Sequence, residues 1–243
     1  MLPLKHKQTF YAVLALVLVA GFAIKVSVAV RAANPAVSLP PPEMNPSVSQ
    51  SNARETAVLS GGCFWGVQGV FEHVAGVKRV VAGYAGGDKN TATYEQVSTG
   101  TTGHAETVEI TFDPRKISFG QILQIFFSVA HDPTELNRQG PDEGTQYRSE
   151  IFYNDSRQRE VAQAYIAQLD RTHILTAPIV TRVDPNKGFF SAEDYHQDYL
   201  IHHPESMYVV FNDLPKVANL RKLFPEFYLE SPVRALKTQS SKG

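Results

Sequence analysis

Apolar residues recur along the chain with two different spacings. Between residues 105 and 112, Val108, Ile110 and Phe112 alternate with polar neighbours, which is typical of a strand with one buried face. Between residues 63 and 74 they are three or four apart, which is typical of a helix packed on a core. The same patterns predict strands over 55–60, 77–84, 148–153 and 179–183, and helices over 118–130, 156–171 and 214–223. Strands and helices mixed in this way predict an α/β sandwich in one domain.

The first 32 residues differ from all that follows. A basic start precedes 15 consecutive apolar or small residues, 10–24, and a small-residue cleavage signal lies at 30–32. A full membrane span needs about 20 apolar residues, whereas a secretory signal needs fewer. We therefore expect residues 1–32 to be a signal peptide or an uncleaved signal anchor. The folded part is then exported, as a periplasmic or other extracytoplasmic protein or a membrane-anchored one.

Prolines mark the next boundary. Residues 33–52 carry five of the 15 prolines, a density that prevents a helix and favours an extended chain. This segment is expected to be a Pro-rich linker. A single folded domain is then expected over residues 53–230, followed by a flexible tail at 231–243.

Charge and cysteine content narrow the range of functions. The chain has 23 basic and 24 acidic residues, and residues 1–32 hold four of the basic ones. This balance gives no electrostatic case for binding nucleic acid. Cys63 is the only cysteine of the sequence, which excludes a disulfide framework or a cysteine-rich metal site within one chain.

Cys63 lies in the segment Gly-Gly-Cys-Phe-Trp-Gly, residues 61–66. The two glycines permit a tight turn after the predicted strand, so that Cys63 begins the predicted helix. Backbone N–H groups and partial positive charge at a helix start favour a thiolate, and we expect them to lower the pKa of the Cys63 thiol. Cys63 is therefore a candidate nucleophile. The competing interpretation is a small buried hydrophobic residue, the usual state of a free cysteine.

Polar residues in three other segments are candidates for the same site. Glu106 enters the strand 105–112 near aromatic residues, where desolvation would keep its carboxyl protonated and able to donate a proton. Taken alone, such an acid is more often solvated, and its spacing does not bring it to Cys63. The loop 140–149 contains Asp142 and Tyr147 and suits either a binding loop or an ordinary connection. Tyr94 taken alone is a packing residue.

The histidines and glycines point to no further chemistry. The histidines lack metal-ligand spacing such as HExxH, so no metal is expected. The glycines at 83, 86 and 87 lack the spacing of a phosphate-binding loop. A hydrolase triad of Cys63 with a distant His and Asp stays open, because triads are recognised in space.

Six motifs in order resemble those of the A-type peptide-methionine (S)-S-oxide reductases, the methionine sulfoxide reductase A family. They are GGCFWG (61–66), GYAGG (83–87), TY (93–94), GHAE (103–106), GTQYRS (144–149) and AEDYHQ (192–197). The resemblance covers about residues 56–228 and implies a two-layer α/β (α+β) sandwich with a mixed sheet and a ferredoxin-like core. It also implies thiol-dependent reduction of methionine S-sulfoxide, free or in proteins, which repairs oxidative damage.

The resemblance also implies the roles of individual residues. Cys63 would attack the sulfoxide sulfur and become a sulfenic acid. Glu106 would protonate the sulfoxide oxygen, Tyr94 and Tyr147 would hydrogen-bond it, and Asp142 would order water or a substrate amide. Substrate binding is implied for Phe64 and Trp65, which would line a pocket for the S-methyl group, and for Gly62 and His104. No metal or organic cofactor is implied.

The sequence departs from the family pattern in two places. Many members carry C-terminal cysteines that convert the sulfenic acid into a disulfide, and this sequence has none. Regeneration is therefore expected from an external thiol: a thioredoxin-like protein, a glutaredoxin-like protein or a small thiol. Pro141 and Glu143 flank Asp142, where an Asn-Asp pair is commoner. Oxidised proteins and free methionine sulfoxide are the expected substrates, and we expect a monomer.

Two other classes of function remain open. The absence of a second thiol favours a binding module that recognises oxidised methionine without turnover. A cysteine hydrolase would instead form an acyl-enzyme on Cys63. Repeated turnover with excess dithiothreitol would exclude the binding module, and a dimedone-reactive sulfenic acid would exclude the hydrolase.

Overall fold

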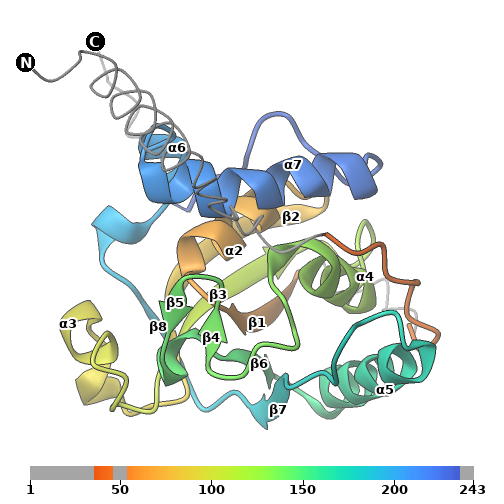
Figure 1. The fold of residues 1–243 in the computed structure, drawn as a ribbon, viewed down its shortest axis with the longest axis horizontal. Helices are drawn as coiled ribbons and strands as arrows, with labels where there is room; N and C mark the ends of the chain where they lie inside the picture. The colour runs from red at the N-terminus through yellow and green to blue at the C-terminus, as the bar shows by residue number, and fades with distance from the viewer. Residues whose placement is uncertain (1–35, 46–53, 236–243) are drawn as a thin grey trace, which may run out of the picture. The chain divides into compact units, whose positions relative to one another are not determined.

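The computed structural model describes residues 36–45 and 54–235. Its main sheet has six strands in the order β7-β6-β1-β3-β2-β8, and every neighbouring pair is antiparallel except β6 and β7. The strands are β1 (Glu55–Gly61), β2 (Val77–Ala85), β3 (Ala105–Phe112), β6 (Ser149–Tyr153), β7 (Arg182–Pro185) and β8 (Phe189–Ser191). A separate two-stranded sheet consists of β4 (Arg138–Gln139) and β5 (Asp142–Glu143). Figure 1 shows both sheets.

Helices of very different length connect these strands. The α-helices are α2 (Phe64–Glu72), α3 (Tyr94–Val97), α4 (Phe119–Ile125), α5 (Ser156–Thr172), α6 (Tyr199–His202) and α7 (Leu214–Leu223). Two π-helical turns, η2 (Phe126–Ala130) and η5 (Val209–Asp213), adjoin α4 and α7, and short 3-10 turns are η1 (Lys89–Thr91), η3 (Thr145–Tyr147) and η4 (Asp194–His196).

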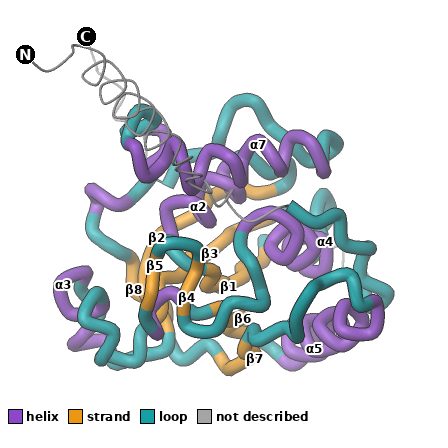
Figure 2. The backbone as a smooth tube through the Cα atoms, viewed as in Figure 1, coloured by secondary structure: helices purple, strands orange, loops and turns teal. Residues whose placement is uncertain are grey.

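The order of these elements gives a ferredoxin-like core. The chain runs β1-α2-β2-β3-α4-β6, and the central strands lie in the order β6-β1-β3-β2, the arrangement of a split βαβ unit. Leu59 and Ile110 face a core that they share with helical residues such as Phe71, whereas Val58 and Phe152 face the opposite side of the sheet. Helices therefore cover one face of the sheet (Figure 2), and the predicted two-layer sandwich with a mixed sheet is confirmed.

Most elements form where the hydrophobic pattern predicts them. The strand 105–112 and the helix 214–223 have the predicted bounds. The predicted helix 118–130 is divided, because α4 passes into the π-helical turn η2 at Phe126. Ser118 caps α4 and forms a capping box with Gln121. Sequence patterning does not find β8, because three residues are too few to show alternation.

Residues 36–45, part of the expected linker, pack on the domain beside α4 and α5 (Figure 1). The Leu39 side chain is buried and its carbonyl accepts a hydrogen bond from Gln124 at 2.9 Å. The hydroxyl of Tyr165 and the amide of Gln168 donate to the carbonyls of Pro40 and Pro41. These ten residues, which we call the N-terminal strap, are therefore held along their length by α4 and α5.

Most residues at the two ends of the chain are not among the described ones. The expected signal segment, 1–32, is not among the described residues. Within 36–45 and 54–235, no helix is long and apolar enough to cross a membrane. At the other end, residues 231–235 of the expected tail pack on the domain, since Ala235 donates its N–H to Asp198 Oδ1 at 2.7 Å.

Candidate active site

The candidate site is built on the turn between β1 and α2. Gly62 has a φ of +87°, and a Cβ at this position would lie 2.5 Å from the Gln139 side chain, so a glycine is required. Cys63 follows as the N-cap of α2 and is 8% exposed. The turn thus places the thiol where the sequence predicts it, at the start of the helix.

The surroundings of Cys63 raise the pKa of its thiol well above the ordinary value. Burial is the largest cause, the carboxyls of Glu106 and Asp213 add to it, and a backbone hydrogen bond from Trp65 opposes it. The expected lowering of this pKa is therefore wrong. The helix start is present, but desolvation and nearby negative charge outweigh it, so that Cys63 rests as a neutral thiol.

Glu106 meets α2 directly. Its Oε2 accepts a hydrogen bond from the backbone N–H of Phe64 at 3.0 Å, and the side chain is buried. Burial raises the pKa of Glu106 to about 8, the Phe64 N–H opposes the shift, and the charges of Asp142 and Asp213 increase it. Glu106 is thus a buried acid with a raised pKa and not the solvated acid that the sequence taken alone favours, and its hydrogen bond to Phe64 brings it next to Cys63, which spacing left open.

Two phenols face the same acid. Tyr94 begins α3 and Tyr147 ends η3. Burial is the largest cause of a raised pKa at both phenols, and ionisation of Glu106 or Cys63 would raise it further. Both hydroxyls therefore stay protonated and can donate hydrogen bonds within electrostatic reach of the thiol and the acid.

Asp142 comes from β5 and is tied to the C-terminal part of the chain. Its carboxylate accepts a hydrogen bond from the hydroxyl of Tyr208. Burial raises the pKa of Asp142, whereas Tyr208 and the charge of Lys216 oppose the shift. The loop that sequence analysis left as either a binding loop or a connection thus brings a carboxylate to the site.

Aromatic rings line the other side. Trp65 stacks on Tyr199 with ring centroids 3.6 Å apart and planes 3° apart, and Tyr208 meets it edge-on. The Trp65 Nε1–H donates to His196 Nδ1 at 3.1 Å, and the His196 ring lies 5.1 Å from that of Phe64. The side chains of Phe64 and Trp65 are therefore fixed in a largely apolar wall.

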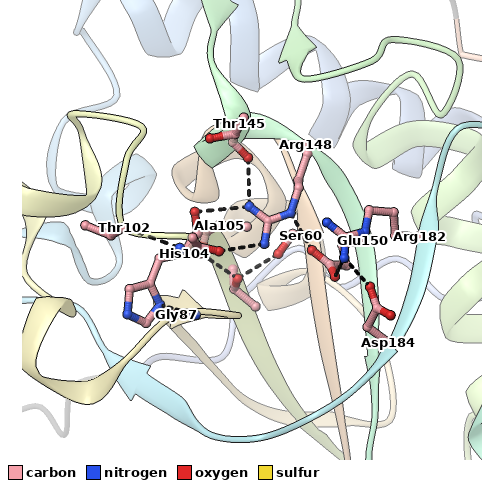
Figure 3. A network of polar contacts seen from close by, with 12 residues as sticks. Ser60, Gly87, Thr102, His104, Ala105, Thr145, Arg148, Glu150, Arg182 and Asp184 are labelled. Carbon is pink, nitrogen blue, oxygen red and sulfur yellow. Dashed lines mark hydrogen bonds and ion pairs between the residues drawn. The ribbon is translucent and has the colours of Figure 1, made fainter.

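The contacts of His104 differ from those of the other predicted residues. Its Nδ1 accepts from the Gly87 N–H at 3.2 Å and its Nε2 lies 2.9 Å from the carbonyl of Asp88. Both ring nitrogens thus contact the loop 86–88, and Figure 3 shows His104 beside Gly87. A substrate-binding role for His104 stays a prediction.

Arg148 joins the loop that leads into β3, the strand of Glu106, to η3, the turn that ends with Tyr147. Its guanidinium donates to the carbonyls of Gly103, His104 and Thr145 at 2.9–3.1 Å and pairs with the buried carboxylate of Glu150. Figure 3 shows this network converging on the guanidinium. A planar fork with five donors suits such a junction.

Sequence reasoning missed four residues of this site. They are His196, Tyr199, Tyr208 and Asp213. The first belongs to the AEDYHQ motif, but the other three lie far along the chain from Cys63 and have no local signal.

Within the described part of the chain, no group of three or more His, Cys, Asp or Glu side chains could hold a metal ion. A neutral thiol, a protonated acid and two phenols beside an apolar wall can protonate and reduce a small polar acceptor.

The sequence and the structure both match known reductases. Residues 55–227 match the family model described as peptide methionine sulfoxide reductase. The chain is 59% identical to "Peptide methionine sulfoxide reductase MsrA 2" of Mesorhizobium japonicum, over 76% of this chain and 95% of that protein. It is 48% identical to the Synechocystis protein of the same name, over 76% of this chain and 86% of the other.

Two solved structures share the fold. Methionine sulfoxide reductase A of Corynebacterium diphtheriae is 32% identical with a TM-score of 0.53, covering 70% of this chain and 89% of that one. Reduced Mxr1 from Saccharomyces cerevisiae is 29% identical with a TM-score of 0.57, covering 66% of this chain and 94% of the other. From the matched family model and these relatives, the chain belongs to the peptide methionine sulfoxide reductases of the A type, enzymes that reduce methionine sulfoxide.

Proposed function

We propose that this enzyme reduces methionine S-sulfoxide, free and in proteins, with Cys63 as the nucleophile and Glu106 as the acid. The observation that carries the proposal is the hydrogen bond from the Phe64 N–H to Glu106 Oε2 at 3.0 Å. It ties a carboxyl that is protonated at neutral pH to the residue that follows the thiol. The acid, from β3, and the nucleophile are thereby held together at the start of α2.

The reaction needs no other redox group. Glu106 gives its proton to the sulfoxide oxygen, which weakens the S–O bond, while the Cys63 sulfur attacks the sulfoxide sulfur. The hydroxyls of Tyr94 and Tyr147 donate to the same oxygen as negative charge develops on it. The oxygen then passes to Cys63, the thiol proton replaces the one that left Glu106, and methionine departs. Cys63 is oxidised to the sulfenic acid and the sulfoxide is reduced to the sulfide.

The aromatic wall fits the apolar end of the substrate. Phe64 and Trp65 are held by His196 and by the stack on Tyr199, so they can enclose the S-methyl group without rearranging. Asp142, whose carboxylate accepts a hydrogen bond from Tyr208, orders water or a substrate amide in this proposal. Gly62 permits the turn that brings these residues together.

Recycling requires a thiol from outside the chain. Cys63 is the only cysteine of the sequence, so the sulfenic acid reacts with an external thiol to give a mixed disulfide and water. A second thiol then releases Cys63 and leaves as the oxidised disulfide. A thioredoxin-like protein, a glutaredoxin-like protein or a small thiol supplies both equivalents, and no resident cofactor takes part. The proposed cycle is that of a monomer.

The location of the enzyme rests on residues 1–32. Their basic start and apolar run of 15 residues support export, with the segment cleaved as a signal peptide or kept as an anchor. The catalytic domain, residues 53–230, would then act outside the cytoplasm. Fractionation of cells expressing the full chain, with N-terminal sequencing of the product, tests both alternatives.

A turnover assay with the separate S and R epimers tests the reaction itself. Excess dithiothreitol should give many equivalents of methionine per enzyme from the S epimer, and Cys63→Ser should give none. A single equivalent would instead support a binding module. Trapping with dimedone after one turnover should label Cys63, and an acyl adduct there would support a hydrolase.

A further inference from the structure

A buried ion pair lies at the beginning of α2, in residues to which no role has been given. The carboxyl of Asp213, the last residue of η5, is fully buried and lies 3.3 Å from the ammonium of Lys216 in α7. The Lys216 side chain is itself only 15% exposed. The pair is therefore part of the protein interior.

Gly66 lets the pair approach the backbone of α2. A Cβ at this position would overlap Asp213 Oδ1 and lie 2.7 Å from Lys216 Nζ. Gly66 is the third residue of the helix that Cys63 caps. Asp213 and Lys216 thus press directly on the turn that presents the nucleophile and the Phe64 N–H.

This arrangement is unfavourable for stability alone. Asp213 Oδ2 is buried and, within the described part of the chain, has no hydrogen-bond partner. Buried ion pairs can often be replaced by apolar residues without loss of stability, and an unsatisfied buried oxygen adds a further penalty. Such a group is found more often where its charge serves the site.

The charged and titratable groups around the pair belong to the reaction. Asp142 of β5 and Lys216 act on Asp213, and Asp213 in turn acts on Cys63, Glu106 and the phenol of Tyr208. Burial raises the pKa of Asp213, and the charge and hydrogen bond of Lys216 lower it, so Lys216 is the group that favours the ionised form. An ionised Asp213 raises the pKa of Glu106. The other groups around Glu106 are the carboxyl of Asp142, which also raises its pKa, the thiol of Cys63 and the phenols of Tyr84, Tyr94 and Tyr147.

We propose that Asp213 is a positioning residue of the reductase site, which fixes the first turn of α2 through Gly66 and holds the proton on Glu106 by its negative charge. Lys216 keeps Asp213 charged and in place. The inference rests on the proposed role of Glu106 as the acid.

The test is the pH dependence of a single turnover. Reduced enzyme is mixed with excess methionine S-sulfoxide without added thiol, and methionine formation is followed between about pH 6 and pH 10. Asp213→Asn keeps the shape and removes the charge, so the loss of rate at high pH should move to lower pH by roughly 0.5–1.5 units. Glu160→Gln, at an exposed acid of α5, should leave it unmoved.

Further readouts separate charge from structure. The infrared C=O band of the protonated Glu106 is identified by its loss in Glu106→Gln. As the pH is raised, this band should disappear at a lower pH in Asp213→Asn than in the wild type, whatever the activity of the variant. If Asp213→Asn does not fold, Asp213→Asn combined with Lys216→Met removes both buried charges and should show a smaller shift in the same direction. A folded variant with an unmoved rate profile and an unmoved band would overturn the inference and leave the proposed function intact. No turnover by the wild-type enzyme would overturn both.

Discussion

The backbone N–H of Phe64 and the carboxyl of Glu106 are joined by a hydrogen bond of 3.0 Å, which links the helix that carries the nucleophile to the strand that carries the acid. Because Phe64 follows Cys63, any shift of α2 changes the thiol and the acid together. Burial raises the pKa of Glu106 to about 8, and the hydrogen bond from Phe64 opposes this rise.

Replacing Glu106 with Gln should lower the activity of the enzyme. The variant keeps the shape but has no proton to transfer, so kcat should fall by roughly 10²–10⁴-fold. Steady-state kinetics with methionine S-sulfoxide measure the loss. Unchanged kinetics would assign the proton to Tyr94, Tyr147 or water.

The same substitution should flatten the pH dependence of stability. The folded-state pKa of Glu106, about 8, lies above the ordinary carboxyl value, so the folded protein retains a proton that the unfolded chain has released. The stabilisation is therefore complete below the ordinary pKa and is lost as the pH rises through about 8. Denaturant titrations between about pH 5 and pH 9 should show a smaller decline for Glu106→Gln than for the wild type. Equal declines would contradict the burial of a protonated Glu106.

Trp65→Ala should weaken substrate binding more than it slows the chemical step. The indole stacks on Tyr199 and donates to His196, so its loss removes one wall of the methyl pocket. We expect KM for methionine S-sulfoxide to rise about tenfold, from lost apolar contact of roughly 1–2 kcal/mol. A fall in kcat alone would point to misplacement of Cys63 instead.

Arg148→Lys should disturb the two loops that the guanidinium joins. Lysine keeps the charge but cannot reach the carbonyls of Gly103, His104 and Thr145 together. Because buried acceptors lose their partners, the free energy of unfolding should fall by about 2–4 kcal/mol. Arg171→Lys, at an exposed arginine paired with Glu43, is the matched control and should change little. Equal stability of the two variants would contradict the role of Arg148.

The N-terminal strap should contribute measurably to stability. Leu39→Ala removes a buried side chain and should lower the free energy of unfolding by about 2–4 kcal/mol. Met44→Ala, at the exposed end of the strap, should have little effect. Chemical denaturation of both variants measures the difference, and a neutral Leu39→Ala would show that the strap is not docked in solution.

Local patterns predicted the core of the fold because they are set by burial within each element. The strand that carries Glu106 and the helix that follows Cys63 both show their apolar spacing directly. The turn at Gly62 was likewise predictable, because few other residues adopt its conformation.

What could not be predicted depends on distant contacts. Tyr208 and Asp213 reach the site only because η5 crosses α2, and no local spacing encodes this crossing. The pKa of Cys63 was predicted in the wrong direction for the same reason. The helix start is local, whereas the burial and the carboxyls that outweigh it come from other segments.

The neutral, nearly enclosed thiol of Cys63 also bears on what the enzyme avoids. Peroxides react with thiolates, and a sulfur that stays protonated is a poor target for them. The burial that keeps Glu106 protonated thus also protects Cys63 from irreversible over-oxidation. An enzyme meant to survive the oxidants whose damage it reverses gains from holding its own sulfur in the less vulnerable form.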